Sequence, residues 1–204
     1  MAAAIATKLK LLKQSSRKTV LLGASGSVAS IKTLEIAGEL IKLGYNVVLV
    51  PTQRSLHFIS MEEFETKVES LNLNEPLFMM FQDVEEWQAW QTRSDPVLHI
   101  ELRKLSDTFV VAPLSANTMG KFANGLADNL LSCVFRAWDF KSSPCIVAPA
   151  MNTYMYESPL TEIQESFLSD KLGVIVLPTV EKVLVCGDKG KGAMASVSDI
   201  VQLV

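Results

Sequence analysis

Four short segments of the chain each place one reactive or hydrogen-bonding side chain beside turn formers or at the end of an apolar run. These side chains are His99 in Asp95–His99, Asn117 in Ala112–Thr118, Asn152 in Pro149–Met155 and Cys186 in Val185–Asp188. An imidazole titrates near neutral pH and suits proton transfer. In open α/β sheets, ligands bind beyond the ends of the strands. We therefore expect these four side chains to contribute to a site at strand ends.

The elements that must position them can be predicted from periodicity. Apolar runs predict strands, and residues at helical spacing predict the helices between them. The predicted strands cover residues 18–23, 45–50, 108–113, 144–149 and 174–178, and the helices cover about 28–41, 115–124, 127–138 and 159–170. This alternation predicts one doubly wound α/β domain, Rossmann-like or flavodoxin-like, with a parallel sheet and helices on both faces. Residues 61–90 are acidic and irregular, and we expect helix and loop there.

Composition narrows the function classes. The net charge of −3 gives no reason to expect nucleic acid or an anionic membrane as a partner. No apolar run approaches the ~20 residues of a transmembrane helix. The three cysteines form no CxxC pair or Cys/His cluster, so we expect no metal site. A reducing, cytoplasmic location is the default for such cysteine usage.

Two segments stand apart from the predicted core. Residues 1–17 are basic and contain no acidic residue, which predicts a disordered arm preceding a domain over 18–204. A transit peptide is the alternative for this segment. Residues 180–194 are rich in glycine and lysine and poor in bulky side chains. A mobile flap of about 180–194 over the site and an ordinary surface loop are both compatible with that composition.

The first strand-to-helix turn, Gly23–Ser27, predicts a phosphate site. Its glycines allow close backbone approach, and the following helix start offers free N–H groups. Ser25 and Ser27 add hydroxyl groups, although a tight turn without a ligand fits the same residues. A dinucleotide fold usually has Asp or Glu after the second strand, whereas here the residues are Pro51–Gln53. The pattern disfavours NAD and favours a mononucleotide, with Thr52 as a neutral hydrogen-bonding group.

Taken together in this order, the segments resemble the flavin-containing cysteine decarboxylases over about residues 18–204. The resemblance implies FMN bound between the subunits of a trimer. A chain with His99, Asn152 and Cys186 can supply complete sites by itself, which favours a homotrimer over a trimer of mixed chains. The residues that it places at FMN are Gly26, Ser27, Val28, Thr52, Phe58, Ser115, Asn117 and Thr118. Without the resemblance, Phe58 would be equally compatible with core packing.

The resemblance also implies a reaction, the decarboxylation of 4′-phosphopantothenoylcysteine to 4′-phosphopantetheine in coenzyme A synthesis. It implies transient oxidation of the thiol carbon by FMN, loss of CO2 and reduction of the resulting ene-thiol. His99 would serve the oxidative half, Asn152 and Met155 would bind the substrate, and Cys186 would protonate the ene-thiol. Asn152 could equally cap the helix that begins near Thr153.

The substrate phosphate needs a cationic partner, and Arg103 and Lys104 follow His99 by about one helical turn. Relatives have two arginines there, and a lysine lacks the bidentate fork of an arginine. Tyr156 also departs from the family pattern, where a tryptophan is usual; it preserves an aromatic ring.

Two other functions fit the same fold. Some relatives inhibit a type 1-like protein phosphatase, which is a binding function. Others decarboxylate a peptide cysteine or transfer a prenyl group. The joint presence of His99, Asn152 and Cys186 favours catalysis, and Cys186 favours complete reduction over release of an ene-thiol.

Overall fold

A computed structural model describes residues 2–70, 76–93, 95–183 and 189–204. The strands are β1 (Thr19–Ala24), β2 (Asn46–Pro51), β3 (Phe78–Met80), β4 (Thr108–Leu114), β5 (Cys145–Pro149), β6 (Ile175–Val176), β7 (Val180–Val183) and β8 (Lys189–Ala193). The first six form one sheet in the order β3-β2-β1-β4-β5-β6, and every pair in it is parallel. The predicted doubly wound α/β fold is confirmed.

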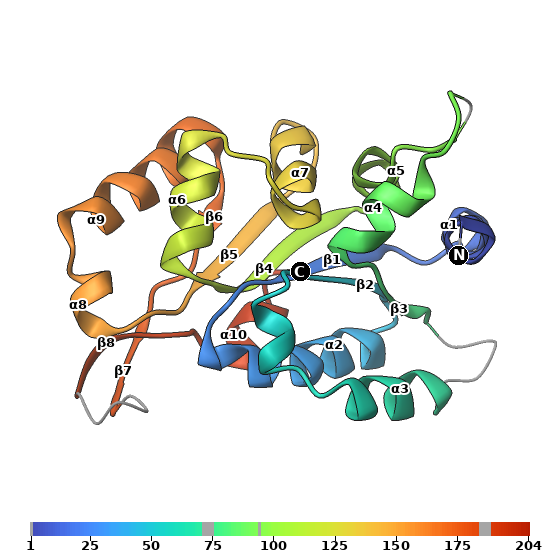
Figure 1. Cartoon of the computed structure of the whole chain (residues 1–204). Helices are drawn as coiled ribbons and strands as arrows, with labels where there is room; N and C mark the ends of the chain where they lie inside the picture. Colours follow the sequence, from blue (N-terminus) through green and yellow to red (C-terminus); the bar gives the residue numbers. More distant parts are fainter. Residues whose placement is uncertain (1, 71–75, 94, 184–188) are drawn as a thin grey trace.

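Helices cover both faces of this sheet (Figure 1). The α-helices are α1 (Ala2–Gln14), α2 (Thr33–Lys42), α3 (Met61–Glu69), α4 (Asp83–Ala89), α5 (Leu98–Leu105), α6 (Ala116–Asn124), α7 (Leu130–Ala137), α8 (Thr153–Tyr156), α9 (Pro159–Ser166) and α10 (Val197–Val201). Shorter turns are the 3₁₀ segments η1 (Val28–Lys32) and η2 (Ser55–His57) and the π-helical η3 (Phe167–Lys171). The helices α5, α6 and α7 lie on one face, and α2, α3 and α10 lie on the other.

The central strands are buried on both faces, which explains their continuous apolar sequences. Every residue of β1, β2, β4 and β5 is buried. Side chains alternate between the faces, so that Phe109 and Val111 of β4 join one core cluster and Val110 joins the other. These layers hold the carboxyl ends of the strands at one edge of the molecule.

The N-terminal segment is ordered, contrary to the prediction of a disordered arm. Residues 2–14 form α1, and its Ile5, Leu9 and Leu12 are buried in the core cluster that covers the α5 side of the sheet. These three residues lie at i, i+4 and i+7, the spacing of one helical face. The basic residues occupy other positions of the helix. The prediction of disorder considered their number and not the spacing of the apolar residues, which is that of an amphipathic helix.

The acidic segment 61–90 also contains a strand that the sequence reading missed. Phe78, Met79 and Met80 form β3 and pair with Val47, Val48 and Leu49 at the edge of the sheet. Three residues are too few to show a clear period, and the acidic residues of α3 and α4 surround them. The predicted helix and loop account for the rest of the described part of this segment.

The glycine-rich segment 180–194 forms an antiparallel pair, β7 with β8, outside the main sheet. Residues 184–188, between these two strands in the sequence, lie outside the described residues. Mobility of this hairpin stays a prediction.

Candidate functional site

The chain changes direction across the sheet between β1 and β4. From β1 it continues to β2 and β3 on one side, and from β4 it continues to β5 and β6 on the other. In such sheets this junction opens a crevice at the carboxyl ends of the two strands, where ligands bind. The loops that follow β1 and β4 contain several of the residues predicted to bind the cofactor.

Ser25 ties these two loops together. Its hydroxyl donates to the carbonyl oxygen of Pro113 at 2.9 Å and accepts from the N–H of Ser115 at 2.7 Å. Its own N–H also donates to the Pro113 oxygen, at 3.1 Å. Ser25 is fully buried, so its hydroxyl fixes the crevice rather than extending into it.

Gly26, Ser27 and Val28 form the exposed part of the first loop. The Ser27 hydroxyl accepts from the N–H of Ala29 and caps η1, and the Val28 side chain is 43% exposed. A side chain at Gly26 would place its Cβ 2.8 Å from the Cβ of Arg54. Arg54, which follows β2, therefore lies against the phosphate loop. Sequence reasoning missed Arg54 because only the fold brings residues 26 and 54 together.

Thr52 joins the β2 loop to the β1 loop. Its N–H donates to the carbonyl oxygen of Ala24 at 2.8 Å, and its hydroxyl accepts from the N–H of Ser55 at 3.4 Å. Phe58 lies just beyond η2, where it is half-buried and makes an edge contact with the His57 ring at 4.9 Å between centroids. The structure therefore brings Gly26 and Thr52 into neighbouring loops, as predicted.

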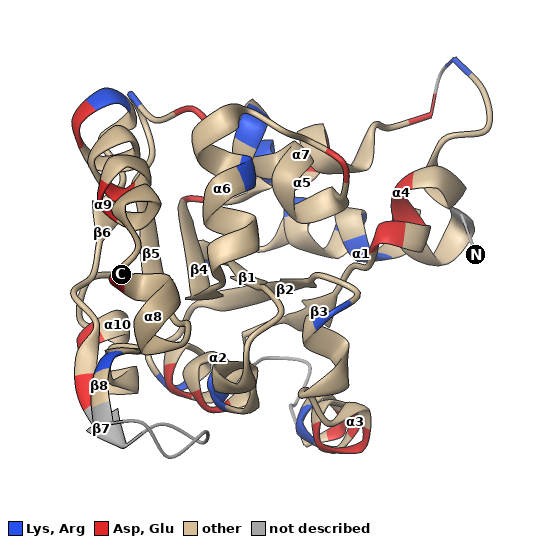
Figure 2. Ribbon diagram, turned by 60° about the vertical axis from the view of Figure 1, so that its left-hand side comes forward, with Lys and Arg blue, Asp and Glu red and all other residues tan. Residues whose placement is uncertain are grey.

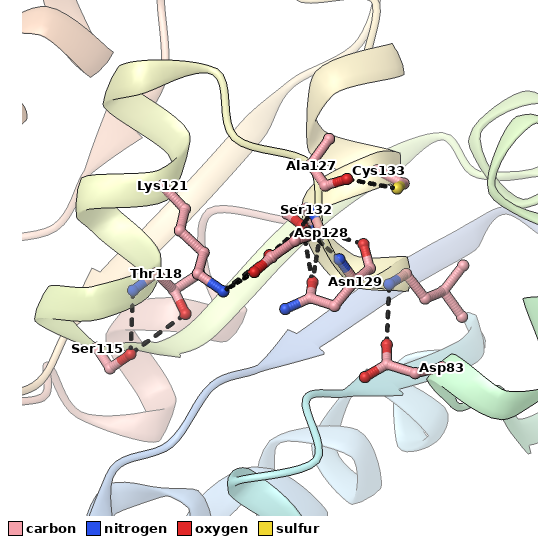
Figure 3. A network of polar contacts seen from close by, with 10 residues as sticks. Asp83, Ser115, Thr118, Lys121, Ala127, Asp128, Asn129, Ser132 and Cys133 are labelled. Atoms are coloured by element: carbon pink, nitrogen blue, oxygen red, sulfur yellow. Dashed lines mark hydrogen bonds and ion pairs between the residues drawn. The ribbon is translucent and has the colours of Figure 1, made fainter.

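Ser115 begins α6 as its capping residue. Its hydroxyl accepts from the N–H of Thr118 at 3.4 Å and donates to the Thr118 hydroxyl at 3.3 Å (Figure 3). Ser115 and Thr118 are buried, whereas Asn117 between them is exposed. This turn of α6 thus presents the Asn117 amide and helix-start N–H groups beside the junction.

A polar network holds α6 against α7 (Figure 3). Lys121 of α6 pairs with both carboxylate oxygens of Asp128, at 2.6 and 2.7 Å. The Ser132 hydroxyl accepts from the N–H groups of Asp128 and Asn129, and Asn129 caps α7. Lys121 holds the pKa of the Asp128 carboxyl below its usual range. The network fixes the loop between the two helices and so the orientation of the Asn117 turn.

His99 lies in the first turn of α5 and is bound by Glu86 of α4. The backbone N–H of His99 donates to Oε2 of Glu86 at 3.0 Å, and its ring Nδ1 lies 2.6 Å from Oε1. The two side chains are 25% and 13% exposed, respectively. The C-terminal end of α5 leads into the amino end of β4. Sequence reasoning missed Glu86, since nothing local pairs residues 86 and 99.

Cys133 and Cys145 differ in their burial. Cys145 at the start of β5 is buried, which raises the pKa of its thiol above the usual range. Cys133 of α7 is only partly buried, and its thiol donates to the carbonyl oxygen of Ala127 at 3.5 Å. Burial is the largest cause that raises the pKa of Cys133, and the carboxylates of Glu86, Asp128 and Asp83 add to it.

Asn152 follows β5 and caps α8. Its side-chain oxygen accepts from the N–H of Tyr154 at 2.9 Å, which confirms the capping role. Met155, on the same short helix, is 51% exposed. Strand β8 passes directly over this motif, because the N–H of Met151 donates to the carbonyl oxygen of Gly192 at 2.9 Å. A side chain at Gly192 would collide with the carbonyl oxygen of Met151.

The antiparallel pair of β7 and β8 therefore contacts the predicted substrate motif through β8. Cys186 lies outside the described residues.

Arg103 and Lys104 lie at the other end of α5 from His99. Arg103 pairs with Asp139 at 3.6 Å, and Lys104 pairs with Glu101 at 3.3 Å. Both line a small pocket of about 120 Å³ together with Trp138. Because α5 leads directly into the amino end of β4, Arg103 and Lys104 lie near the amino ends of the strands. Within a single subunit they are therefore away from the carboxyl ends of the strands. Their role as ligands of a substrate phosphate stays a prediction.

Comparison with known proteins identifies relatives over nearly the whole chain. A family profile described as Flavoprotein matches residues 9–204. Phosphopantothenoylcysteine decarboxylase of Mus musculus is 45% identical over 186 residues, covering 91% of this chain and 84% of that protein. Phosphopantothenoylcysteine decarboxylase of Arabidopsis thaliana is 46% identical over 185 residues, covering 91% of this chain and 82% of that one.

Solved structures show the same fold. One is a Cys-to-Ser mutant of PPC decarboxylase complexed with pantothenoylaminoethenethiol, with a TM-score of 0.82 and 44% identity over 92% of this chain and 96% of that chain. Another is the FMN binding protein AtHal3, with a TM-score of 0.78 and 45% identity over 92% of this chain and 94% of that one. Peptidyl-cysteine decarboxylase EpiD, at 20% identity and a TM-score of 0.70, shares the fold.

Proposed function

The chain belongs to the flavoprotein family, and we propose that it is an FMN-dependent decarboxylase that converts 4′-phosphopantothenoylcysteine to 4′-phosphopantetheine for coenzyme A synthesis. Relatives with that substrate in their names are about 45% identical over 91% of the chain. The observation that supports the proposal most strongly is the imidazole of His99 held by the Glu86 carboxylate, in a chain whose β1 and β4 loops are rich in neutral hydrogen-bonding groups.

The loops at the junction suit FMN. Segments 24–28, 51–55 and 113–118 together contain one charged residue, Arg54, and are otherwise glycine, hydroxyl, amide and apolar residues. Gly26 permits close approach to a phosphate, and the start of η1 supplies N–H groups toward it. Ser27 and Val28 would lie at the phosphate, while Thr52, Phe58, Ser115, Asn117 and Thr118 would surround the rest of FMN.

The residues of the chain would divide the chemistry between them. When bound, FMN supplies a reversible hydride acceptor beside the substrate thiol, without net redox change. His99 takes the thiol proton as the neighbouring carbon is oxidised, and the Asn152 amide binds the carboxylate that leaves as CO2. Cys186 then donates a proton to the ene-thiol while hydride returns. A neutral amide suits Asn152, because a full cation would oppose loss of the carboxylate.

Assembly as a homotrimer, with FMN between subunits, follows from the same proposal. Exposed apolar side chains near the predicted FMN and substrate residues support it. They include Ile31 (62% exposed), Tyr154 (76%) and Ile163 (64%). Such a surface typically marks a protein interface. Sedimentation velocity should give three times the subunit mass of 22.4 kDa, and a monomer would contradict this assembly.

We also place the protein in the cytoplasm. No helix among the described residues could cross a membrane. Cys133 and Cys145 are both free thiols, in keeping with a reducing compartment.

The proposal is tested by the absorption spectrum of the purified protein and by anaerobic addition of 4′-phosphopantothenoylcysteine. Flavin absorbance and formation of 4′-phosphopantetheine would support it. A protein that cannot be reconstituted with FMN would contradict the cofactor. A flavin-loaded protein that leaves this substrate unchanged would contradict the reaction, and inhibition of a type 1-like phosphatase by that same protein would support the regulatory alternative.

A further inference from the structure

Glu86 contacts His99 in a way that constrains the protonation of the imidazole. One carboxylate oxygen accepts the backbone N–H of His99 at 3.0 Å, and the other lies 2.6 Å from ring Nδ1. A carboxylate has only acceptor oxygens, so the short contact to Nδ1 requires a proton on that nitrogen. The lone pair of the neutral ring is then on Nε2, which has no hydrogen-bond partner among the described residues.

The helix that carries Glu86 is held by its own capping contact and by contacts with α1 and α7. Glu85 accepts the N–H of Gln82 at 2.8 Å and pairs with Lys8 of α1 at 2.9 Å. Asp83 accepts the N–H of Leu130 at 2.8 Å, which ties α4 to the start of α7. These contacts hold α4 independently of Glu86. Glu86 is therefore presented to His99 by a helix whose position does not depend on their contact.

We propose that Glu86 is a positioning residue that makes Nε2 the proton-accepting atom of His99. The proposal rests on the proposed decarboxylation. In the oxidative half, the S–H bond of the substrate breaks and its proton goes to Nε2. FMN, when bound, would accept the hydride of the adjacent carbon, which balances the oxidation of that carbon and the formation of the C=S bond. The Glu86 carboxylate then lies beside the imidazolium and stabilises its charge.

Kinetics of Glu86→Gln provide the first test. A glutamine can either accept from or donate to Nδ1, so it no longer selects one tautomer. We expect kcat to fall about 10-fold to 100-fold, within the range of general acid–base catalysis, with little change in KM. Glu85→Gln is the matched control, because its amide oxygen can still accept the N–H of Gln82 and Asp83 still ties α4 to Leu130, so α4 is retained while a carboxylate that does not contact His99 is removed. An unchanged kcat in Glu86→Gln would overturn the proposal.

The tautomer itself can be observed by ¹⁵N NMR of the holoenzyme labelled at histidine. The chain has only His57 and His99, and a His57→Gln variant assigns their signals. At a pH where the ring is neutral, we expect His99 protonated on Nδ1 in the parent protein and in Glu85→Gln. In Glu86→Gln we expect an increased share of Nε2–H.

A parent protein with His99 protonated on Nε2 would overturn the proposal even if the enzyme is active. The proposed function fails in a different way, through absence of CO2 release by the parent protein, and the tautomer measurement remains decisive for Glu86 in that case. A merely structural role for Glu86 would leave the tautomer unchanged.

Discussion

At the scale of single residues, the structure separates side chains that bind ligands from side chains that hold the loops. Ser25 and Ser27 both belong to the predicted phosphate loop, yet Ser25 is buried in contacts with Pro113 and Ser115. Sequence indicated the loop, because glycines and serines follow an apolar strand. The sequence could not indicate which of the two hydroxyl groups is hydrogen-bonded within the protein, since the partner of Ser25 is Ser115, 90 positions away.

Gly26→Ala should weaken FMN binding without unfolding the protein. The new methyl group would lie 2.8 Å from the Cβ of Arg54 and would displace the β1 loop from the β2 loop. We expect less flavin absorbance per subunit after gel filtration, with far-UV circular dichroism unchanged. Gly120→Ala is the control, because its methyl group would meet only the side chain of Gln164, at 3.5 Å. Full flavin content in Gly26→Ala would refute a close approach at this position.

Cys186→Ser should separate the two halves of the reaction. The variant retains His99 and Asn152, so we expect it to release CO2, limited to one equivalent per flavin in the anaerobic reaction because the flavin would stay reduced. The proton donor for the ene-thiol is weakened, so a product with two hydrogens fewer than 4′-phosphopantetheine should accumulate. Mass spectrometry of the anaerobic reaction distinguishes the two products. Formation of the fully reduced product at the parent rate would remove Cys186 from the mechanism.

At the scale of elements, α1 supports the two helices that contain Glu86 and His99. It packs beside α4 and α5 at one end of the molecule (Figure 2). Lys8 of α1 pairs with Glu85, and Lys13 pairs with Glu101 at 2.7 Å.

The long apolar strands were predictable because burial on both faces leaves a continuous hydrophobic run. The helix α1 and strand β3 were not, because their signals are short and lie among charged residues.

Leu9→Ala should destabilise the fold by about 2 to 4 kcal/mol, the usual cost of removing a buried leucine side chain. Leu9 is 3% exposed, whereas Leu11 in the same helix is 45% exposed and provides the control. Urea unfolding should therefore show a lower midpoint for Leu9→Ala and nearly the parent midpoint for Leu11→Ala. Equal midpoints for the two variants would show that α1 does not pack as described.

The Lys13–Glu101 pair predicts a pH dependence. The hydrogen bond with Lys13 is the largest cause that holds the pKa of Glu101 below its ordinary value of 4.5, and burial opposes it. A pKa that is lower in the folded state stabilises the protein above pH 4.5, and this stabilisation is lost as the pH falls through the folded-state pKa.

Lys13→Gln should therefore reduce the free energy of unfolding at pH 7 by less than about 1 kcal/mol, because the pair is partly exposed. The difference from the parent should shrink as the pH falls below 4.5. Urea titrations at several pH values measure it, with Lys10→Gln on the exposed side of α1 as the control. A difference that grows on acidification would contradict the assigned direction.

At the scale of the whole molecule, the strand order positions the site. The alternation of strands and helices in the sequence predicts a parallel sheet whose successive strands are connected through helices. It does not predict that β1 and β4 are neighbours, which depends on how the two halves pack. Because β1 and β4 are neighbours, the loops that contain Gly26 and Ser115 lie together. The contact of Gly192 with Met151 brings β8 to the loop that follows β5.

Turnover of 4′-phosphopantothenoylcysteine labelled with ¹³C at its carboxyl carbon is the most direct test of the proposed decarboxylation. The flavin-loaded protein is incubated anaerobically with this substrate, and the released gas and the thiol product are analysed by mass spectrometry. If the chain is this decarboxylase, we expect ¹³CO2 and unlabelled 4′-phosphopantetheine in equal amounts, with the flavin oxidised after turnover. Absence of ¹³CO2 from a flavin-loaded protein would contradict it.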